Sequence, residues 1–279
     1  MITYNNSVLK VGSSWLEPSP INLPPCTIRF LFEDSSFDPT TYRSDWVAGS
    51  TWTRVASSPN VWDYYRQASS WHSEFASKMP SSNHHVIASN TSGITNLAFL
   101  FHYDYGLKTV SALNTGDATD VNSVFAGCEH LERVPSVLDV STATNTSFLF
   151  YGCSVLSVFP SLDLVNSTDA EAMFFNCFNM TTFPTLYNTG SVENFSSMFQ
   201  GTSITSIPLF DTSSADTVDE MFRGCVDVQG GALAMYNQLS TQAHQPVYYY
   251  NCFYECGSDT VSGAAELAQI PSSWGGTGA

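Results

Sequence analysis

Histidine and cysteine are the residue types in this chain that could bind zinc, and their spacing gives that chemistry little support. His84 and His85 are adjacent, and three residues separate Cys252 from Cys256. Structural zinc sites use four such side chains. A single pair of cysteines at this spacing is weak evidence for one, so two surface histidines and two ordinary cysteines are the favoured interpretation. We therefore expect neither a metal nor a cofactor.

Carboxylates recur along the chain, but in positions that favour turns over catalysis. Asp139 and Asp163 could share a calcium ion, yet Asn114 and Asn188 occupy the same repeating position and interrupt the charge. Short polar side chains there can bond their own backbone and form a turn. Glycosidases need two carboxylates facing each other across a cleft. No HExxH, phosphate-loop, dinucleotide-binding or G-x-S-x-G motif occurs. We expect a protein that is not an enzyme; a polysaccharide hydrolase is the weakest alternative.

The strongest pattern is a repeat. FAGCEHLERVP at 125–135 returns as FYGCSVLSVFP at 150–160. Six anchor phenylalanines follow one another at intervals of 23 to 25 residues: Phe101, Phe125, Phe150, Phe174, Phe199 and Phe222. A period in the twenties is typical of a solenoid in which each coil contains one strand.

Two further columns accompany the anchors. Cysteine stands three residues after an anchor at Cys128, Cys153, Cys177 and Cys225, and Thr202 takes this position in one coil. Proline closes the apolar segment of a coil at Pro135, Pro160, Pro184 and Pro208, where the missing N–H would end a strand. A small thiol can donate weakly to a backbone carbonyl, and we expect Thr202 to do the same. Coils about 4.8 Å apart would allow disulfides by distance, but buried free thiols are favoured because a chain without a secretory signal usually keeps its thiols reduced.

These columns resemble the bacterial leucine-rich repeats of the BspA type. The pattern of an aromatic residue, a gap of two, cysteine, leucine and a strand ending near proline is carried by FAGCEHLERVP, FYGCSVLSVFP, FFNCFNMTTFP and MFQGTSITSIP, over about half of the chain. One of these coils lacks the cysteine, and the last degenerates into VQGGALAMYNQ. Members of that family are mostly surface adhesins, and copies occur in bacteriophage and prophage proteins of gut bacteria. CTIRFLF and the ELAQIPSSWGG ending also resemble segments of such phage proteins.

Composition and the repeat together predict three parts. Residues 1–88 are expected to form a small β-containing domain, with strands at CTIRFLF, WTRVA and VWDYY and a helix after the last. It contains Trp15, Trp46, Trp52, Trp62 and Trp71, interpreted as core or cap in preference to a sugar platform. Residues 89–229 would be the solenoid. Residues 230–279, with a helix at ALAMYNQLSTQA and the aromatic run QPVYYYNCFYECG, would be a cap or an oligomer contact. The expected fold class is α+β or mainly β, with a leucine-rich-repeat-like solenoid of coils of 23 to 25 residues.

The net charge of the chain limits the classes of partner that it can bind. The formal net charge is −16, and only Lys108, Arg133 and Arg223 stand against eighteen acids from Ser89 onward. Such a surface would repel phosphate backbones and anionic lipids, so we expect no nucleic-acid partner and no membrane insertion.

The sequence therefore predicts a non-enzymatic structural and binding protein. The resemblance, the acidic surface and an N-terminus that does not read as a secretory signal favour a bacteriophage virion component, such as a head or tail fibre or a decoration protein. It would be assembled in the host cytoplasm beside other virion proteins, as a homo-oligomer (a trimer, by analogy), and would adhere to a bacterial surface protein or glycan. The alternative is a bacterial cell-surface adhesin. The residues that bind the receptor are not predicted.

Overall fold

The computed structural model describes residues 23–278 except 57 and 59, together with the backbone of four two-residue strands near the N-terminus. These strands pair as two short antiparallel ladders: β1 (Thr3–Tyr4) with β2 (Ser7–Val8), and β3 (Lys10–Val11) with β4 (Ser14–Trp15). The side chain of Trp15 lies outside the described residues, as does much of the expected first domain before residue 23.

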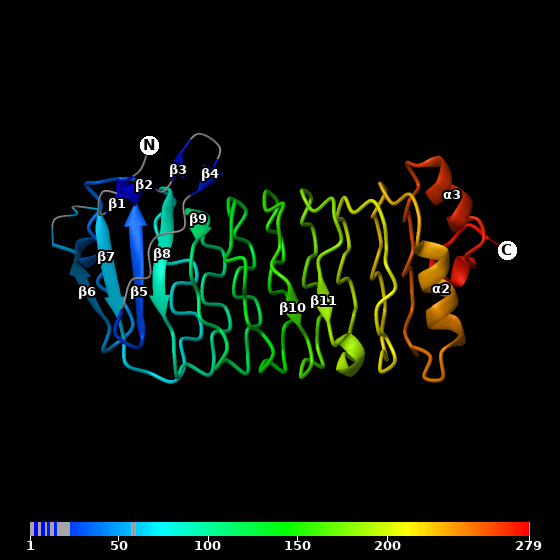
Figure 1. Ribbon diagram of the computed structural model, residues 1–279, viewed down its shortest axis with the longest axis horizontal. Helices are drawn as coiled ribbons and strands as arrows, with labels where there is room; N and C mark the ends of the chain where they lie inside the picture. Colours follow the sequence, from blue (N-terminus) through cyan, green and yellow to red (C-terminus); the bar gives the residue numbers. More distant parts are fainter. Residues whose placement is uncertain are drawn as a thin grey trace.

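A mixed five-stranded sheet forms the N-terminal end of the described molecule (Figure 1). Its strand order is β6-β7-β5-β8-β9, and only the pair formed by β8 and β9 is parallel. The strands are β5 (Thr27–Phe32), β6 (Thr51–Arg54), β7 (Val61–Tyr65), β8 (His84–Asn90) and β9 (Leu107–Val110). One helical turn, α1 (Pro39–Tyr42), precedes β6. The strands expected at CTIRFLF, WTRVA and VWDYY are thus confirmed, whereas the helix expected after VWDYY is absent.

Aromatic side chains fill the space beside this sheet. The Phe30 ring lies 5.1 Å from Phe75 and 5.5 Å from Trp52. Trp62 and Trp71 are buried, and Trp46 and Trp52 pack half-buried against the core. Apolar rings removed from water contribute most of the stabilisation that a small sheet of this kind can obtain. The described tryptophans therefore have core positions.

From about residue 69 the chain winds in successive coils that lie side by side along the long axis (Figure 1). We call residues 69–256 the repeat stack. Single parallel bridges join equivalent positions of neighbouring coils, in the order Ser70, Asn96, Asp120, Asn145, Asp169, Asn194, Thr217 and Tyr248. Each coil therefore contacts the next at the same place, one period further along the chain.

The backbone N–H groups around each anchor alternate between two kinds of acceptor. In the coil of Phe101, every second N–H crosses to the next coil: Leu97, Phe99, Phe101 and Tyr103 donate to the carbonyls of Asp120, Asn122, Val124 and Ala126. The N–H groups between them stay in their own coil, where Leu100, His102 and Asp104 donate to carbonyls three residues earlier. The stack is therefore held by a main-chain ladder that runs through tight turns.

This arrangement shows that the predicted leucine-rich-repeat-like solenoid, with a strand in every coil, is wrong. The described residues are mostly turns and loops, with the mixed sheet and few helices. The turns need a positive φ two residues before and two residues after an anchor, as at Ser123 (56°) and Gly127 (73°). Strand backbone has negative φ, so the turn segment around each anchor is not a strand. The position where a strand was expected, six to nine residues after an anchor, is a strand in the coil of Phe101, as β9, and consists of turns, loops or a single bridge in the later coils. After the prolines, parallel pairing among the described residues consists of β10 (Leu162–Asp163) with β11 (Leu186–Tyr187), over two residues each, and a single bridge between Val137 and Ser161.

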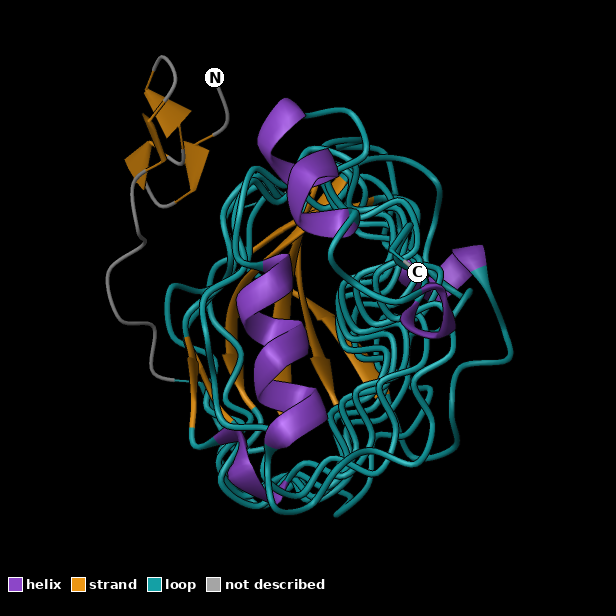
Figure 2. Cartoon of the chain, turned by 90° about the vertical axis from the view of Figure 1, so that its right-hand side faces the viewer, coloured by secondary structure: helices purple, strands orange, loops and turns teal. Residues whose placement is uncertain are grey.

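Apart from α1, the helices among the described residues lie in the later part of the chain. They are η1 (Thr189–Ser191), α2 (Ala232–Thr241), α3 (Val261–Leu267) and η2 (Ser272–Trp274). The helix expected at ALAMYNQLSTQA is confirmed as α2. Seen from the C-terminal end, α2 and α3 lie across the coils (Figure 2), and the Phe253 N–H donates to Trp274 O. No helix among the described residues is long and apolar enough to cross a membrane.

The three expected domains remain a prediction. The division between residues 88 and 89 falls inside β8, whose parallel partner β9 belongs to the coil of Phe101. The division at 229 and 230 precedes α2, and a further coil of the stack follows that helix. Sheet and stack are thus joined by continuous main-chain pairing.

Candidate functional site

The anchor phenylalanines form a column of buried rings inside the stack. All six rings are fully buried. Centroids of successive rings are 5.4 to 5.9 Å apart and their planes differ by 4 to 15°. Two rings that the spacing did not reveal extend the column: Phe75 stacks on Phe101 at 5.5 Å and Phe253 on Phe222 at 5.7 Å. They were missed because their intervals, 26 and 31 residues, depart from the period.

Each cysteine of the column joins its coil to the preceding one. Sulfur-to-oxygen distances are 3.0 to 3.2 Å for the pairs Cys128–Phe101, Cys153–Phe125, Cys177–Phe150 and Cys225–Phe199, each sulfur donating to a backbone carbonyl. Thr202 behaves differently, because its hydroxyl donates to Phe199 O of its own coil. All seven cysteines are free thiols. Burial raises the pKa of the Cys225 thiol to about 12, so this side chain stays protonated and is a poor nucleophile.

The prolines stand nine or ten residues after the anchors, beyond the cysteine position. Pro135, Pro160 and Pro184 are buried, whereas Pro208 is exposed. A shallow groove of about 330 Å³ passes between Pro135 and Pro160. Its lining includes Val158 and Phe159 together with Glu132 and Arg133.

The carboxylates proposed as turn formers do cap turns. Asp139 Oδ1 accepts the N–H of Ser141 at 3.0 Å, and Asp211 Oδ1 accepts that of Ser213 at 2.9 Å. A second column, not recognised from the sequence, does the same and alternates amide with carboxylate: Asn96, Asp120, Asn145, Asp169 and Asn194. The alternation keeps like charges out of adjacent coils. Nowhere in the described part of the chain do three or more potential ligands gather as for a metal ion.

The histidines and cysteines considered for zinc lie far apart. His84 and His85 belong to β8, at one end of the molecule, and Cys252 and Cys256 belong to the last coil, at the other (Figure 1). His84 Nε2 instead lies 3.0 Å from Asp104 Oδ2, with both side chains fully buried. His85 Nδ1 lies 2.8 Å from Thr109 Oγ1. Both histidines join the sheet to the first coils.

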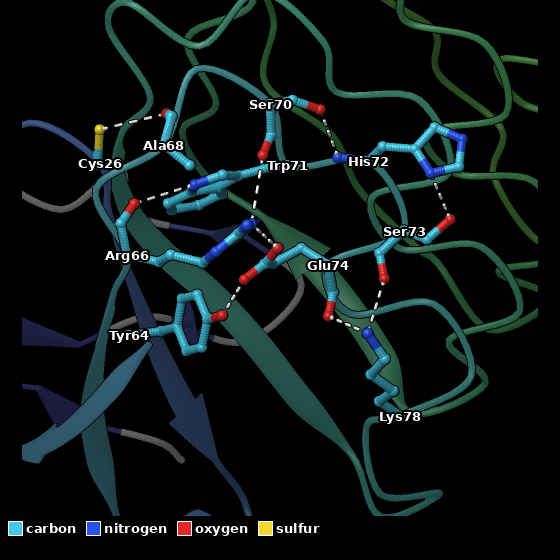
Figure 3. A network of polar contacts seen from close by, with 10 residues as sticks. All are labelled: Cys26, Tyr64, Arg66, Ala68, Ser70, Trp71, His72, Ser73, Glu74 and Lys78. Atoms are coloured by element: carbon cyan, nitrogen blue, oxygen red, sulfur yellow. Dashed lines mark hydrogen bonds and ion pairs between the residues drawn. The ribbon is translucent and has the colours of Figure 1, made fainter. Parts of the chain in front are cut away.

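A second buried polar network attaches the first coil to β7 (Figure 3). Glu74 is buried; its Oε2 lies 2.7 Å from Arg66 Nη1, and its Oε1 accepts the Tyr64 hydroxyl. Lys78 occupies the position that cysteine takes in later coils, and its ammonium donates to the carbonyls of Ser73 and Glu74 at 3.0 and 3.1 Å. Burial raises the pKa of Tyr64 and lowers that of Lys78. Since every oxygen of Glu74 is engaged, the network is structural.

One surface combines exposed aromatic rings with polar groups. We call it the turn face; it lies one, two and four residues after the anchors. Its exposed and half-buried rings are Tyr103, Tyr105, Tyr151, Phe175 and Phe178. The rings of Tyr151 and Phe175 are stacked at 4.8 Å and differ by 8°.

The middle of the turn face is lined by small residues. Between the two groups of rings lie Ala126 and Gly127, and the Tyr103 ring lies so close to Gly127 that a Cβ there would clash with it. Glu129 and His130 are exposed in the same coil. Ring faces beside a carboxylate and an imidazole can bind a ligand that is apolar on one side and polar on its rim.

The main-chain ladder and the ring column define a repeat protein whose coils span 23 to 31 residues. The family model described as "Mycoplasma protein of unknown function, DUF285" matches residues 69–183 and 159–250, together 182 of 279 residues, and the chain belongs to this family. No curated protein matches the chain, and no solved structure matches it. The resemblance to BspA-type repeats stays a prediction.

Proposed function

We propose that this protein is a non-enzymatic structural and binding protein whose turn face adheres to a bacterial surface protein or glycan. The observation that carries the proposal is the stacked, half-buried pair Tyr151 and Phe175. Exposed rings occupy the same face, Phe178 in the coil of Phe175 and Tyr103 with Tyr105 in the coil of Phe101. Apolar rings gathered at a surface commonly mark a binding site. Glu129 and His130 beside them supply hydrogen-bonding groups, a mixture that suits the faces and hydroxyls of a sugar.

The backbone beneath the turn face supports this proposal. Each coil under the rings is bonded to the next through alternate N–H groups, so the rings occupy fixed positions. A preformed arrangement loses little conformational entropy when a ligand binds. Among the described residues the fully buried carboxylates are Glu74 and Asp104, and both bind neighbouring side chains, which favours binding over hydrolysis.

The location that we propose is a bacteriophage particle. The repeat motifs and flanking segments that resemble phage proteins support it, and so does the acidic surface, which keeps an abundant particle component soluble. The alternative is a bacterial cell-surface adhesin. The turn face would serve adhesion in either location, so location and binding need separate tests.

Cell binding tests the turn face. Purified protein is applied to bacteria of the species whose genome or phage encodes the chain, and retained protein is measured after washing. Replacing Tyr151 and Phe175 by alanine should lower retention roughly tenfold, since a few central aromatic residues usually dominate an interface. Val158→Ser, an exposed change on the proline side, is the matched control. If the receptor is a glycan, periodate treatment of the cells should abolish retention of the protein; if it is a protein, protease treatment should do so. Equal retention of all variants would refute the proposal.

Mass spectrometry of purified phage particles tests the location. Peptides at stoichiometric abundance beside capsid or tail proteins are the expected result. Their absence from particles, with peptides in the bacterial envelope, would replace the virion by the cell surface.

A further inference from the structure

The last coil of the stack breaks the polar column of the earlier coils. At the bridge position, where earlier coils have mainly asparagine, aspartate or threonine, it has Tyr248, and two residues later it has Tyr250. The two side chains are 61% and 68% exposed. Tyr249 between them stacks on Trp274 with a centroid distance of 4.3 Å. Tyr249 therefore serves the core, whereas its two neighbours point into solvent.

The turn does not need these two tyrosines. In earlier coils, an aspartate or asparagine accepts the N–H two residues later, and Tyr248 cannot. The Tyr250 N–H instead donates to Asp219 Oδ1 of the preceding coil at 2.5 Å. The ladder continues through the backbone carbonyls, with Val218 and Glu220 donating to Tyr248 O and Tyr250 O at 2.8 Å. Two large apolar side chains are thus held on a rigid backbone without a structural task.

The surroundings of Tyr248 and Tyr250 are acidic. The coil beside them contributes Asp216, Asp219 and Glu220; the Asp216 side chain is 54% exposed, and its Oδ1 lies 2.8 Å from His244 Nε2. From Ser89 onward the chain has three basic residues, and only Arg223 belongs to this part of the stack. Aromatic faces beside carboxylates attract cations.

Arg223, which like Tyr254 lies at the turn-face position one residue after a ring of the column, shows how the last coils hold a guanidinium. Its Nη1 lies 2.5 Å from Glu220 Oε1, and its Cζ lies 5.5 Å over the ring of Tyr254 in the last coil. A carboxylate residue in one coil and a tyrosine in the next are also joined at two further places: the Tyr250 N–H donates to Asp219 Oδ1, and the Tyr248 N–H donates to Asp216 O. The chain has no further arginine or lysine after Arg223.

We propose that Tyr248 and Tyr250, with the carboxylates of Asp216 and Asp219, form a docking surface for a lysine- and arginine-rich segment of a partner protein. Electrostatic attraction would bring the segment to the acidic coil, and the tyrosine rings would select cations that can lie over them. This surface is separate from the turn face and involves a different partner, so either can exist without the other.

A peptide of nine arginines, labelled for fluorescence anisotropy, tests this surface on the full chain. Replacing both tyrosines by alanine should weaken binding about five- to twentyfold, as expected for two exposed cation–π contacts. Replacing both by phenylalanine should preserve binding, because the ring faces remain. Tyr105→Ala with Phe178→Ala on the turn face is the matched control and should have no effect. Equal thermal unfolding of all variants shows that the fold is kept.

Three results would overturn the proposal. In the first, the alanine variant binds the peptide as tightly as the natural protein, so that attraction depends on net charge alone. In the second, a nonaglutamate peptide binds equally well. In the third, light scattering shows self-association that only the alanine variant loses, which would assign the surface to a second copy of the chain.

Discussion

The N-terminal sheet and the repeat stack differ in how they pair their backbone N–H groups and pack their aromatic rings. In the sheet, β5 is paired on both sides over most of its length, and its rings pack against an irregular aromatic cluster. In the stack, half of the turn N–H groups of each coil donate to carbonyls of the same coil, and the other half donate to carbonyls of the next coil. Each coil also contributes one ring to a regular column. The sheet depends on many unlike contacts, and the stack on one contact repeated, so a change to the repeated contact should affect two interfaces at once.

The largest expected effect comes from removing one ring of the column. Phe150 stacks on both Phe125 and Phe174 and meets Phe159 edge-on. Phe150→Ala should lower the free energy of unfolding by about 3–5 kcal/mol, the usual cost of a cavity of this size. Urea unfolding measures the change, and Phe178→Ala, which removes an exposed ring, should cost less than about 0.5 kcal/mol. A small cost at Phe150 would contradict this and show that the column can collapse around a gap.

The junction between the two regions should respond to pH, with opposite contributions from adjacent histidines. Burial lowers the pKa of His84, but the charge of Asp104 and its hydrogen bond outweigh this, so that the pKa is raised. Its stabilisation is complete below the unfolded value of about 6.5 and is lost as pH rises through the folded pKa. Burial lowers the pKa of His85 despite Glu33, so its contribution is lost as pH falls below about 6.5.

Urea unfolding from pH 5 to 9 separates the two histidines. Relative to the natural protein, His84→Gln should lose most stability at acidic pH, and His85→Gln should lose least there. Lys108 and Glu132 lie near this junction and form an ion pair at 3.3 Å, so Lys108→Gln serves as a control for general charge effects. Parallel pH profiles of the two histidine variants would contradict the assignment.

The smallest expected effect concerns the positive-φ turn conformation, which distinguishes the backbone of the stack from that of the sheet. Gly152 has φ of 69°, and a Cβ there would meet no atom closer than 3.8 Å. Gly152→Ala should therefore cost only the conformational penalty, about 1–2 kcal/mol. Gly224, also at 69° with similar space, should show the same cost in thermal unfolding. Ser157→Ala, exposed in the coil of Phe150, is the control.

The sequence reveals this architecture where side-chain identity and period coincide. Anchors such as Phe125 and cysteines such as Cys153 stand out because one buried position per coil accepts few side chains. The turn conformation could not be read, since Ser123, Phe148 and Glu220 adopt positive φ with ordinary residues. The strand expected between cysteine and proline is present in the coil of Phe101, as β9, and is replaced by turns and loops in the later coils. Phe75 and Phe253 were missed because the sheet and helix α2 alter the spacing on each side of them.

The turn face could be predicted only in part. Aromatic residues can be found in the sequence, but their exposure and grouping depend on which positions of a coil point outward. Tyr151 and Phe175 meet because both follow an anchor by one residue. The column of Asn96 and Asp120 escaped notice because asparagine, aspartate and threonine are common throughout the chain, and its regularity is apparent only from the bridges.

The identical joins between coils make the molecule modular in length. Because Phe125 N–H donates to Leu149 O in the same way that Phe150 N–H donates to Met173 O, a chain that lost or duplicated one whole coil would find the same donors, acceptors and ring positions at the new junction. The two family matches overlap over residues 159–183, which is the length of one coil. Each such event would change the span between the two ends by about 4.8 Å without altering either end. Gene duplication could therefore adjust the reach of this protein in equal steps.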